Sequence, residues 1–315
     1  MLDALGRDIN YLRMSITDQC NLRCFYCMPA GWSGRADLLS FEEMLKICFL
    51  SAGLGITRVR VTGGEPLLRN GAAKFCKDIS HVPGIGHVSL TTNGALLQRH
   101  LPELAGVLSS CNISLDTCQA EKYKTITGGG SLDKAMDAIF ETLRLGIPVK
   151  LNCVASTAFD EQDALDLASL AKDYPLTVRF IELMPIGPSS GATLNGDQIF
   201  ALLEKRYGRL EPMKDNVGGG PAACFKPKGF AGKIGFISPL TSNFCSSCNR
   251  LRLTADGRLK PCLFLGKPVD LKALIRSGAS DSELKEAISS AVKGKPQDGC
   301  PSKGAVEEGM FRIGG

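Results

Sequence analysis

The chain has 315 residues, of which 44% are hydrophobic and 22% charged, as in an ordinary globular protein. This length suffices for one large α/β domain, or for one domain with an appendage. The formal net charge of +5 suits a small anionic substrate, but it is too weak and too evenly spread to predict nucleic-acid binding.

Membrane insertion, export and disulfide bonding are not expected. No apolar run approaches the length of a membrane span, and residues 1–10 carry charges where a signal peptide would need an apolar core. We therefore expect a cytoplasmic protein, or a protein of an organelle matrix if a transit peptide has been removed. The 13 cysteines should then be metal ligands and reduced thiols.

Strand-like and helix-like segments alternate along the first 182 residues. Ser40 and Glu43 have the spacing of a capping box ahead of the first helix. The predicted strands lie at residues 11–17, 56–62, 87–92, 111–115, 149–154 and 176–182. The predicted helices lie at residues 40–52, 71–79, 95–108, 132–145 and 161–174.

The alternation predicts six β-then-α units, and therefore parallel strands joined by right-handed crossovers. A closed barrel of this kind needs eight units. We therefore predict an α/β fold, a partial (β/α)6 TIM-type barrel whose open side is covered by a C-terminal α+β extension. A loop at residues 185–191 separates the predicted barrel, residues 1–190, from a C-terminal domain, residues 191–315.

The C-terminal part has its own elements. Its pattern predicts helices at 195–207 and 282–293, a strand at 234–238 and a hairpin-like stretch at 250–259. Parallel α/β folds place their chemistry at the carboxyl ends of strands, and polar or reactive residues of the first part obey this rule. These residues are Cys20, Gly63–Pro66, Thr91–Asn93, Ser114–Asp116, Lys150, Asn152, Glu182 and Met184.

Three cysteines follow the first predicted strand in the spacing C-x3-C-x2-C: Cys20, Cys24 and Cys27. Three thiolates on one loop suit an iron–sulfur cluster and leave one iron without a protein ligand. The spacing, with Tyr26 directly before the last cysteine, resembles the motif of the radical S-adenosylmethionine (radical SAM) superfamily. That resemblance implies that S-adenosylmethionine binds the open iron. The alternatives are a zinc site or unligated thiols, although zinc usually takes four ligands.

A second set of three cysteines lies near the C-terminus: Cys245, Cys248 and Cys262. It predicts a second cluster with one open iron, whereas the alternative is a zinc site completed by Cys300 or Cys224. The next residues include Arg250 and Arg252, which lie on one face of a strand because side chains alternate. Two guanidinium groups beside a cluster suggest an anion site, although alone they would suit a solvated strand face.

These features together resemble the GTP 3',8-cyclase family, which carries out the first step of molybdenum cofactor biosynthesis. The likeness runs nearly from end to end. The stretches that carry it are residues 12–18, 20–29, 60–67, 91–94, 114–116, 150–154, 182–185, 250–257 and the terminal Gly314-Gly315. The family implies two 4Fe–4S clusters, held by the two cysteine sets, with S-adenosylmethionine on the first and GTP on the second.

The resemblance also assigns roles to single residues. The residues implied to contact S-adenosylmethionine are Tyr26, Gly64, Ser114 and Met184. The residues implied to bind GTP are Arg13, Arg60, Thr91, Lys150, Arg250, Leu251 and Arg252. The residues implied to act in catalysis are Arg13, Arg252, Gly314 and Gly315. The family gives no role to the other cysteines, which we expect to be core residues or incidental thiols: Cys48, Cys76, Cys111, Cys118, Cys153, Cys224 and Cys300.

The implied reaction is the radical cyclisation of GTP to (8S)-3',8-cyclo-7,8-dihydroguanosine 5'-triphosphate, driven by an external one-electron reductant. A homodimer is left open, and nucleic-acid and membrane partners are not expected. The first alternative is another radical SAM enzyme with an auxiliary cluster, such as a peptide maturase. The second is a two-cluster electron carrier or a zinc scaffold, neither of which needs polar residues at the ends of barrel strands.

Overall fold

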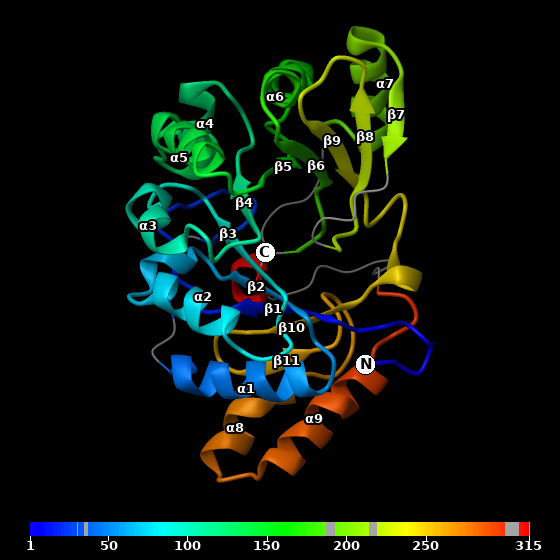
Figure 1. Ribbon diagram of the computed structural model, residues 1–315. Coiled ribbons are helices and arrows are strands. Elements are labelled where there is room, and N and C mark those ends of the chain that lie inside the picture. The colour runs from blue at the N-terminus through cyan, green and yellow to red at the C-terminus, as the bar shows by residue number, and fades with distance from the viewer. Residues whose placement is uncertain (30, 35–36, 187–192, 214–218, 300–308, 315) are drawn as a thin grey trace.

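The computed structural model describes residues 1–29, 31–34, 37–186, 193–213, 219–299 and 309–314. Its centre is a curved parallel sheet with helices on the outer side (Figure 1). The six strands of the first part are β1 (Tyr11–Ser15), β2 (Arg58–Thr62), β3 (His87–Thr92), β4 (Ser110–Ser114), β5 (Val149–Ala155) and β6 (Thr177–Glu182). They are hydrogen-bonded in sequence order, and every neighbouring pair is parallel, which confirms the predicted (β/α)6 core.

Helices connect these strands outside the sheet. They are α1 (Phe41–Gly53), the 3-10 helix η1 (Pro66–Leu68), α2 (Ala72–Ser80), α3 (Leu97–Leu104), α4 (Ala120–Thr127), α5 (Leu132–Arg144) and α6 (Glu161–Asp173). The predicted capping box of α1 is present, because Ser40 Oγ accepts from the Glu43 amide at 3.1 Å and Glu43 accepts from the Ser40 amide at 2.7 Å. The sequence did not predict α4. The helix predicted to reach residue 108 ends at Leu104, and Gly106 adopts a φ of +77° in the turn that follows.

The part after residue 190 extends the sheet at both edges instead of forming a separate layer. Strand β9 (Lys233–Ile237) pairs parallel with β6 and is followed outward by β8 (Ala223–Pro227) and β7 (Leu210–Met213). At the other edge, β10 (Arg250–Leu253) pairs parallel with β1 and continues into β11 (Arg258–Lys260) and β12 (Val269–Asp270). The predicted hairpin at 250–259 is therefore present, and one twelve-stranded sheet runs from β12 to β7.

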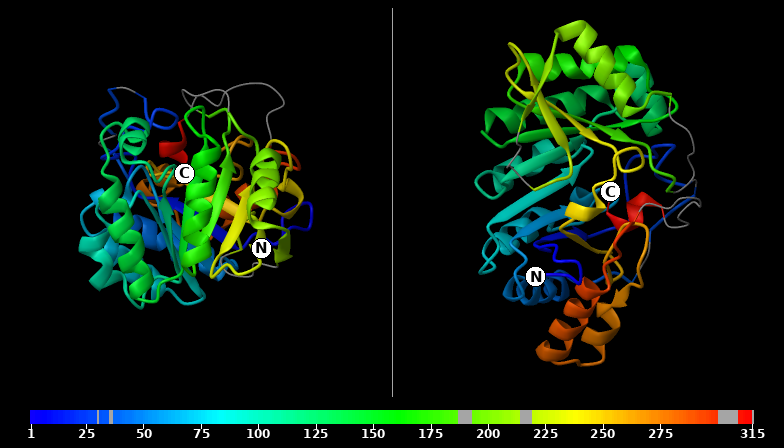
Figure 2. Two further views of the ribbon diagram at one scale, coloured as in Figure 1. Left: turned by 90° about the horizontal axis from the view of Figure 1, so that it is seen from above. Right: turned by 90° about the vertical axis from the view of Figure 1, so that its right-hand side faces the viewer.

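The remaining helices lie at the ends of this sheet. They are α7 (Gly196–Tyr207), the 3-10 helix η2 (Cys245–Ser247), α8 (Leu271–Arg276), α9 (Asp281–Lys293) and α10 (Met310–Ile313). Helices α8 and α9 lie beside α1, whereas the C-terminal segment with α10 lies on the concave side of the sheet (Figures 1 and 2). The extension thus reaches both the edges and the open side of the barrel.

Alternation along the strands separates the core from the barrel interior. Leu12 and Met14 of β1 are fully buried against the helices, as are Val59 and Val61 of β2. Their neighbours Arg13 and Arg60 point to the concave side, because successive side chains of a strand face opposite ways. Burial of each large aliphatic side chain contributes about 1.5–3 kcal/mol, so the outer face stabilises the sheet and leaves the inner face free for polar residues.

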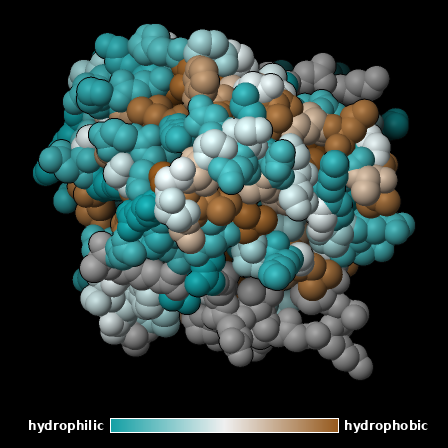
Figure 3. All heavy atoms as spheres, turned by 90° about the horizontal axis from the view of Figure 1, so that it is seen from below, coloured by the Kyte–Doolittle hydropathy of each residue, from teal (hydrophilic) through white to brown (hydrophobic). Residues whose placement is uncertain are grey.

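The cysteines outside the two sets are mostly buried, as expected. Those that the structure describes as buried are Cys48, Cys76, Cys111, Cys153 and Cys224, while Cys118 is half-buried and Cys300 lies outside the described residues. Hydrophilic and apolar residues are intermixed on the face shown in Figure 3. Within the described ranges, the model contains no helix that combines the length and the apolar character needed to cross a bilayer.

Candidate active site

The concave side of the sheet encloses a cavity of about 290 Å³. Both cysteine sets line it, although they are more than 200 residues apart in the chain. Side chains from the inner faces of β1, β2 and β10 line the same space, among them Arg13, Arg60 and Arg252. The cavity therefore brings together the two predicted cluster-binding cysteine sets and the predicted anion-binding arginines.

The first cysteine set lies on the loop after β1. The Leu22 amide donates to Cys20 Sγ at 3.4 Å, and the Phe311 amide donates to Cys27. Burial raises the pKa of all three thiols, that of Cys27 to about 12, so without a metal they are neutral. Cluster binding at this set must therefore release protons.

The second cysteine set combines η2 with the loop after β11. Arg250 Nη2 lies 3.5 Å from Cys248 Sγ, and the Gly299 amide donates to Cys245 Sγ at 3.3 Å. Burial alone would raise the pKa of Cys248, but the cations Arg250 and Lys295 outweigh it and lower that pKa to about 6. The second set is thus a cationic environment, unlike the first.

The donor chemistry at both sets fits iron–sulfur clusters. Each set offers three thiols and at least one backbone N–H directed at sulfur, a contact that is typical of cluster ligands. Among the residues that the structure describes, no three Cys, His, Asp or Glu side chains are placed to hold a single metal ion. Cys224, an alternative zinc ligand, lies on β8 opposite Gly235 and does not line the cavity, and Cys300 lies outside the described residues.

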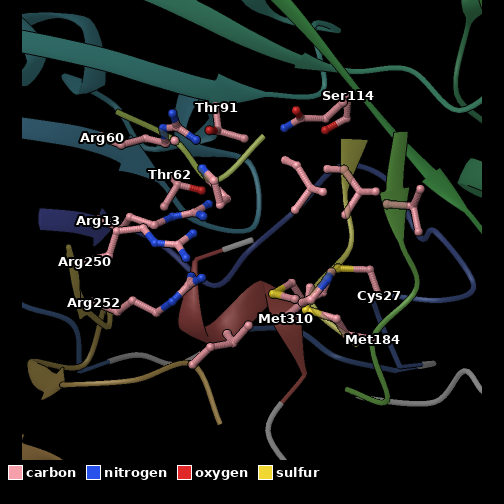
Figure 4. Close-up of a pocket in the computed structure, with 18 of the residues that line it drawn as sticks. Arg13, Cys27, Arg60, Thr62, Thr91, Ser114, Met184, Arg250, Arg252 and Met310 are labelled. Atoms are coloured by element: carbon pink, nitrogen blue, oxygen red, sulfur yellow. The ribbon is translucent and has the colours of Figure 1, made fainter. Parts of the chain in front are cut away.

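Four arginines form the cationic end of the cavity. Arg13 is paired in register with Arg252 on one side and with Arg60 on the other, and Arg250 lies two residues before Arg252 on β10. Figure 4 shows Arg13, Arg250 and Arg252 extending toward one another, with Cys27 and Met184 at the other side of the cavity. Burial and then the neighbouring guanidinium groups lower the pKa of Arg13 and Arg252, that of Arg252 to about 10. Such crowding favours a multiply charged anion.

The other residues predicted to bind GTP lie in different positions. Thr91 of β3 lines the cavity. Lys150 is buried on β5, opposite Asn112 and Thr177, and is not among the lining residues. The side chain of Leu251 is only 1% exposed and belongs to the hydrophobic core, so only its backbone is available to a ligand.

The residues predicted to contact S-adenosylmethionine all line the cavity: Tyr26, Gly64, Ser114 and Met184. The structure gives Gly64 a packing reason in addition to ligand access. A Cβ atom there would lie 2.3 Å from the Gln19 carbonyl oxygen, so a larger residue would displace the loop that carries Cys20.

Two buried carboxyl groups, neither of them a predicted site residue, support this side of the cavity. Glu65 accepts from Thr92 Oγ1 at 2.8 Å and from the Asn93 amide at 2.7 Å, which joins the ends of β2 and β3. Asp116 accepts from Tyr26 Oη at 2.6 Å and from the Val154 amide at 2.9 Å. Burial raises the pKa of Glu65 to about 7 and that of Asp116 to about 6. Both residues follow directly after a strand, and this position in the sequence was the signal that could have predicted a role at the site.

The C-terminal tail enters the cavity. Met310 and Phe311 of α10 line it, and the Gly314 carbonyl accepts from Arg252 Nη1 at 2.7 Å. Gly314 has a φ of +75°, and a Cβ atom there would lie 2.7 Å from Thr62 Cγ2. Gly315, the other predicted tail residue, lies outside the described residues.

Comparison with known proteins links the two cysteine sets to two families. A model of the radical SAM superfamily matches residues 14–171, and a model described as Molybdenum Cofactor Synthesis C matches residues 176–300. A GTP 3',8-cyclase of Moorella thermoacetica is 43% identical, and one of Syntrophomonas wolfei is 42% identical; each alignment covers 100% of both chains.

The fold also resembles a solved structure that holds S-adenosylmethionine. The crystal structure of Streptococcus suis SuiB bound to S-adenosylmethionine superimposes with a TM-score of 0.64. It is 14% identical, and the match covers 93% of this chain and 73% of SuiB, so this likeness concerns the fold alone. The family matches and the full-length relatives go further: the chain belongs to the GTP 3',8-cyclase family of the radical SAM superfamily.

Proposed function

We propose that this protein converts GTP to (8S)-3',8-cyclo-7,8-dihydroguanosine 5'-triphosphate, the first step of molybdenum cofactor biosynthesis. The full-length relatives named GTP 3',8-cyclase and the match to Molybdenum Cofactor Synthesis C support it. The observation that carries the proposal is that two cysteine triads and five arginines, the four named above and Arg179, open into one cavity. A radical enzyme that acts on a nucleoside triphosphate needs these groups within reach of one substrate.

The cofactors are two 4Fe–4S clusters and S-adenosylmethionine, and an external one-electron reductant drives the reaction. When bound, they supply the one-electron chemistry that removes the hydrogen at ribose C3' of GTP and joins that carbon to guanine C8. Cys20, Cys24 and Cys27 hold the first cluster. Cys245, Cys248 and Cys262 hold the second.

The chain's own contribution is to bind and orient GTP. Arg13, Arg60, Arg250 and Arg252 offer forked donors that match phosphate oxygens, and their mutual repulsion is relieved when a triphosphate enters. Thr91 adds a hydroxyl from the cavity lining, and Leu251 offers only its backbone. Lys150, a buried cation of β5 that does not line the cavity, contributes its charge to the site instead of a direct contact. GTP bound in this way presents its ribose to the radical source and has already lost its rotational freedom before the reaction begins.

The opposite side of the cavity orients S-adenosylmethionine. We assign this role to Tyr26, Gly64, Ser114 and Met184, which line the cavity near the first cysteine set. The hydrogen bond from Tyr26 to Asp116 fixes the tyrosine that lies between two cluster ligands. Gly314 lies beside Arg252, so the tail helps to exclude water from the reacting groups. We assign catalytic roles to Arg13, Arg252, Gly314 and Gly315.

Three further expectations belong to this proposal. One is the division into a barrel of residues 1–190 and a C-terminal domain of residues 191–315. A homodimer and a cytoplasmic location are the other two. Sedimentation of the holoenzyme and cell fractionation would measure them.

Two assays test the proposed function. The anaerobic protein should contain about eight irons per chain, as two 4Fe–4S clusters require. With reductant, GTP should drive formation of 5'-deoxyadenosine and of a cyclised product that has the same elemental composition as GTP, whereas ATP should not. Equal 5'-deoxyadenosine yields with ATP or with a peptide would contradict the cyclase and favour another radical SAM enzyme.

A further inference from the structure

Two buried cations outside the predicted site residues lie against the second cysteine set. Lys295, which follows α9, is only 5% exposed and lines the cavity. Its Nζ donates to the Arg250 carbonyl at 2.8 Å and to the Pro261 carbonyl at 2.7 Å, and it also bonds to Cys248. An ammonium group has three N–H donors, so these three acceptors use all of them.

Arg7 is the second cation. It is 8% exposed, and its Nε forms an ion pair with Asp3 at 2.6 Å. Nη1 donates to the Cys245 carbonyl at 2.8 Å, and Nη2 donates to the Pro296 carbonyl at 2.8 Å and the Lys295 carbonyl at 3.2 Å. One side chain near the N-terminus therefore fastens the segment after α9 to the first cysteine of the second set.

The segment after α9, residues 295–299, packs directly against the second cysteine set. The Gly299 amide donates to Cys245 Sγ, and a Cβ atom on Gly299 would lie 2.6 Å from Cys262 Sγ. Residues 295–299 thus contact all three cysteines, through Lys295 at Cys248 and through Gly299 at the other two.

We propose that Arg7 and Lys295 are positioning residues of the second cluster. The three cysteines lie at the two ends of the β10–β11 hairpin, whose pairing of Arg252 with Lys260 brings η2 and the loop after β11 together but does not fix either loop beyond the strands. Lys295 joins both loops through the carbonyls of Arg250 and Pro261, and Arg7 fixes the beginning of η2 through the Cys245 carbonyl.

Charge supports the same assignment. Burying an ammonium group is costly unless an anion accompanies it. Asp3 accompanies Arg7, whereas the contacts of Lys295 described above are two neutral carbonyls and the sulfur of Cys248. Three thiolates bound to a cluster would supply the negative charge and make the bond from Lys295 to sulfur charge-assisted. The site is therefore built for a loaded, anionic cluster.

The inference rests on the proposed function only in requiring a second cluster, and its test measures iron instead of cyclisation. In Lys295→Met, anaerobically reconstituted protein should fall from about eight irons per chain to about four. The retained cluster should still change its electron paramagnetic resonance spectrum when S-adenosylmethionine is added, which shows that the first set is folded. Lys295→Arg keeps the charge and should regain part of the lost iron.

Lys293→Met, at an exposed position of α9, is the matched control and should keep the full iron content. Eight irons in Lys295→Met would overturn the proposal. If Lys295→Met does not fold, the iron content of Arg7→Lys tests the proposal instead. This variant keeps the positive charge beside Asp3, but lysine cannot donate to all three carbonyls that Arg7 contacts. Reduced iron in Arg7→Lys, again with a responsive first cluster, supports the proposal, and full iron contradicts it. Failure of the cyclase assay with eight irons would contradict the proposed function alone.

Discussion

Arg252 has one unfavourable neighbour, another arginine, and one favourable contact, a hydrogen bond to a carbonyl. It lies beside Arg13 in the register of β10 and β1, which costs electrostatic energy in the unliganded protein, and it donates to the Gly314 carbonyl. Arg252 is only 7% exposed, so solvent relieves little of the repulsion. The repulsion destabilises the unliganded site, and a bound anion would relieve it.

Arg252→Ala should therefore weaken GTP affinity while both clusters remain. A hydrogen bond to a charged group is worth about 1.5–3 kcal/mol, so we expect a loss of about 10- to 100-fold, measured by calorimetry on the loaded protein. Arg258→Ala, at an exposed position of β11, is the control. Unchanged GTP affinity in Arg252→Ala would contradict its role.

His87 should make stability fall on acidification. Burial and then the cations Arg58, Lys150 and Arg60 lower its pKa from 6.5 to about 4. The unfolded chain therefore binds a proton between pH 6.5 and pH 4 that the native state does not bind, so the free energy of unfolding decreases through that window. Because His87 is partly exposed, we expect about 1–2 kcal/mol after allowing for solvent screening.

Urea unfolding of apo protein at several pH values measures this contribution. The difference between the wild type and His87→Gln should change between pH 6.5 and pH 4. At pH 7.5 histidine is neutral in both states, so the difference there reports lost contacts alone. A difference that is constant over the whole range would show that His87 does not titrate as described.

At the scale of elements, α10 is short, and its position depends on contacts outside its own backbone. The Phe311 ring lies 5.2 Å from the Trp32 ring, and the Arg312 guanidinium lies 4.7 Å above the same indole. Trp32 in turn donates to the Asp18 carbonyl at 3.2 Å, on the loop that carries the first cysteine set. These contacts connect the tail to the first cluster loop.

Phe311→Ala should release the tail and move the Trp32 emission of apo protein to longer wavelength. Trp32 is the chain's one tryptophan, so the signal has a single source. Loss of an aromatic pair of about 0.5–1.5 kcal/mol shifts the docking equilibrium by about two- to tenfold, and GTP turnover should fall with it. Phe49→Ala, at a residue 56% exposed on α1, should leave the emission unchanged. An unshifted spectrum in Phe311→Ala would show that the tail is held by other contacts.

The elements that sequence patterns predict are those whose pattern is local. Strands β1 to β6 alternate or carry apolar runs, and the cap of α1 lies within four residues, so both were predictable. The pairing of β10 with β1 joins residues more than 230 positions apart, and no local pattern encodes it. For the same reason the cysteine sets could be found from their spacing, whereas Lys295 and Arg7, isolated charges in unremarkable stretches, could not.

At the scale of the whole molecule, both edges of the six-stranded core are closed by strands from the part after residue 190. Strand β10 protects the edge of β1, and β9 protects the edge of β6. Exposed edges of a parallel sheet offer unpaired N–H and C=O groups to other chains. The part that carries the second cluster is thus also the part that completes the barrel.

A fragment of residues 1–190 should therefore not behave as an independent domain. It lacks β9 and β10 and would leave two strand edges unpaired, while Arg7 would lose its carbonyl partners at Cys245 and Pro296. We expect association in sedimentation experiments and no cooperative thermal transition, whereas the full chain should unfold cooperatively. A monomeric fragment with a sharp transition and four irons would show that the barrel folds alone. The division at residue 190 would then be a true domain boundary, and the edge strands would serve the active site more than the fold.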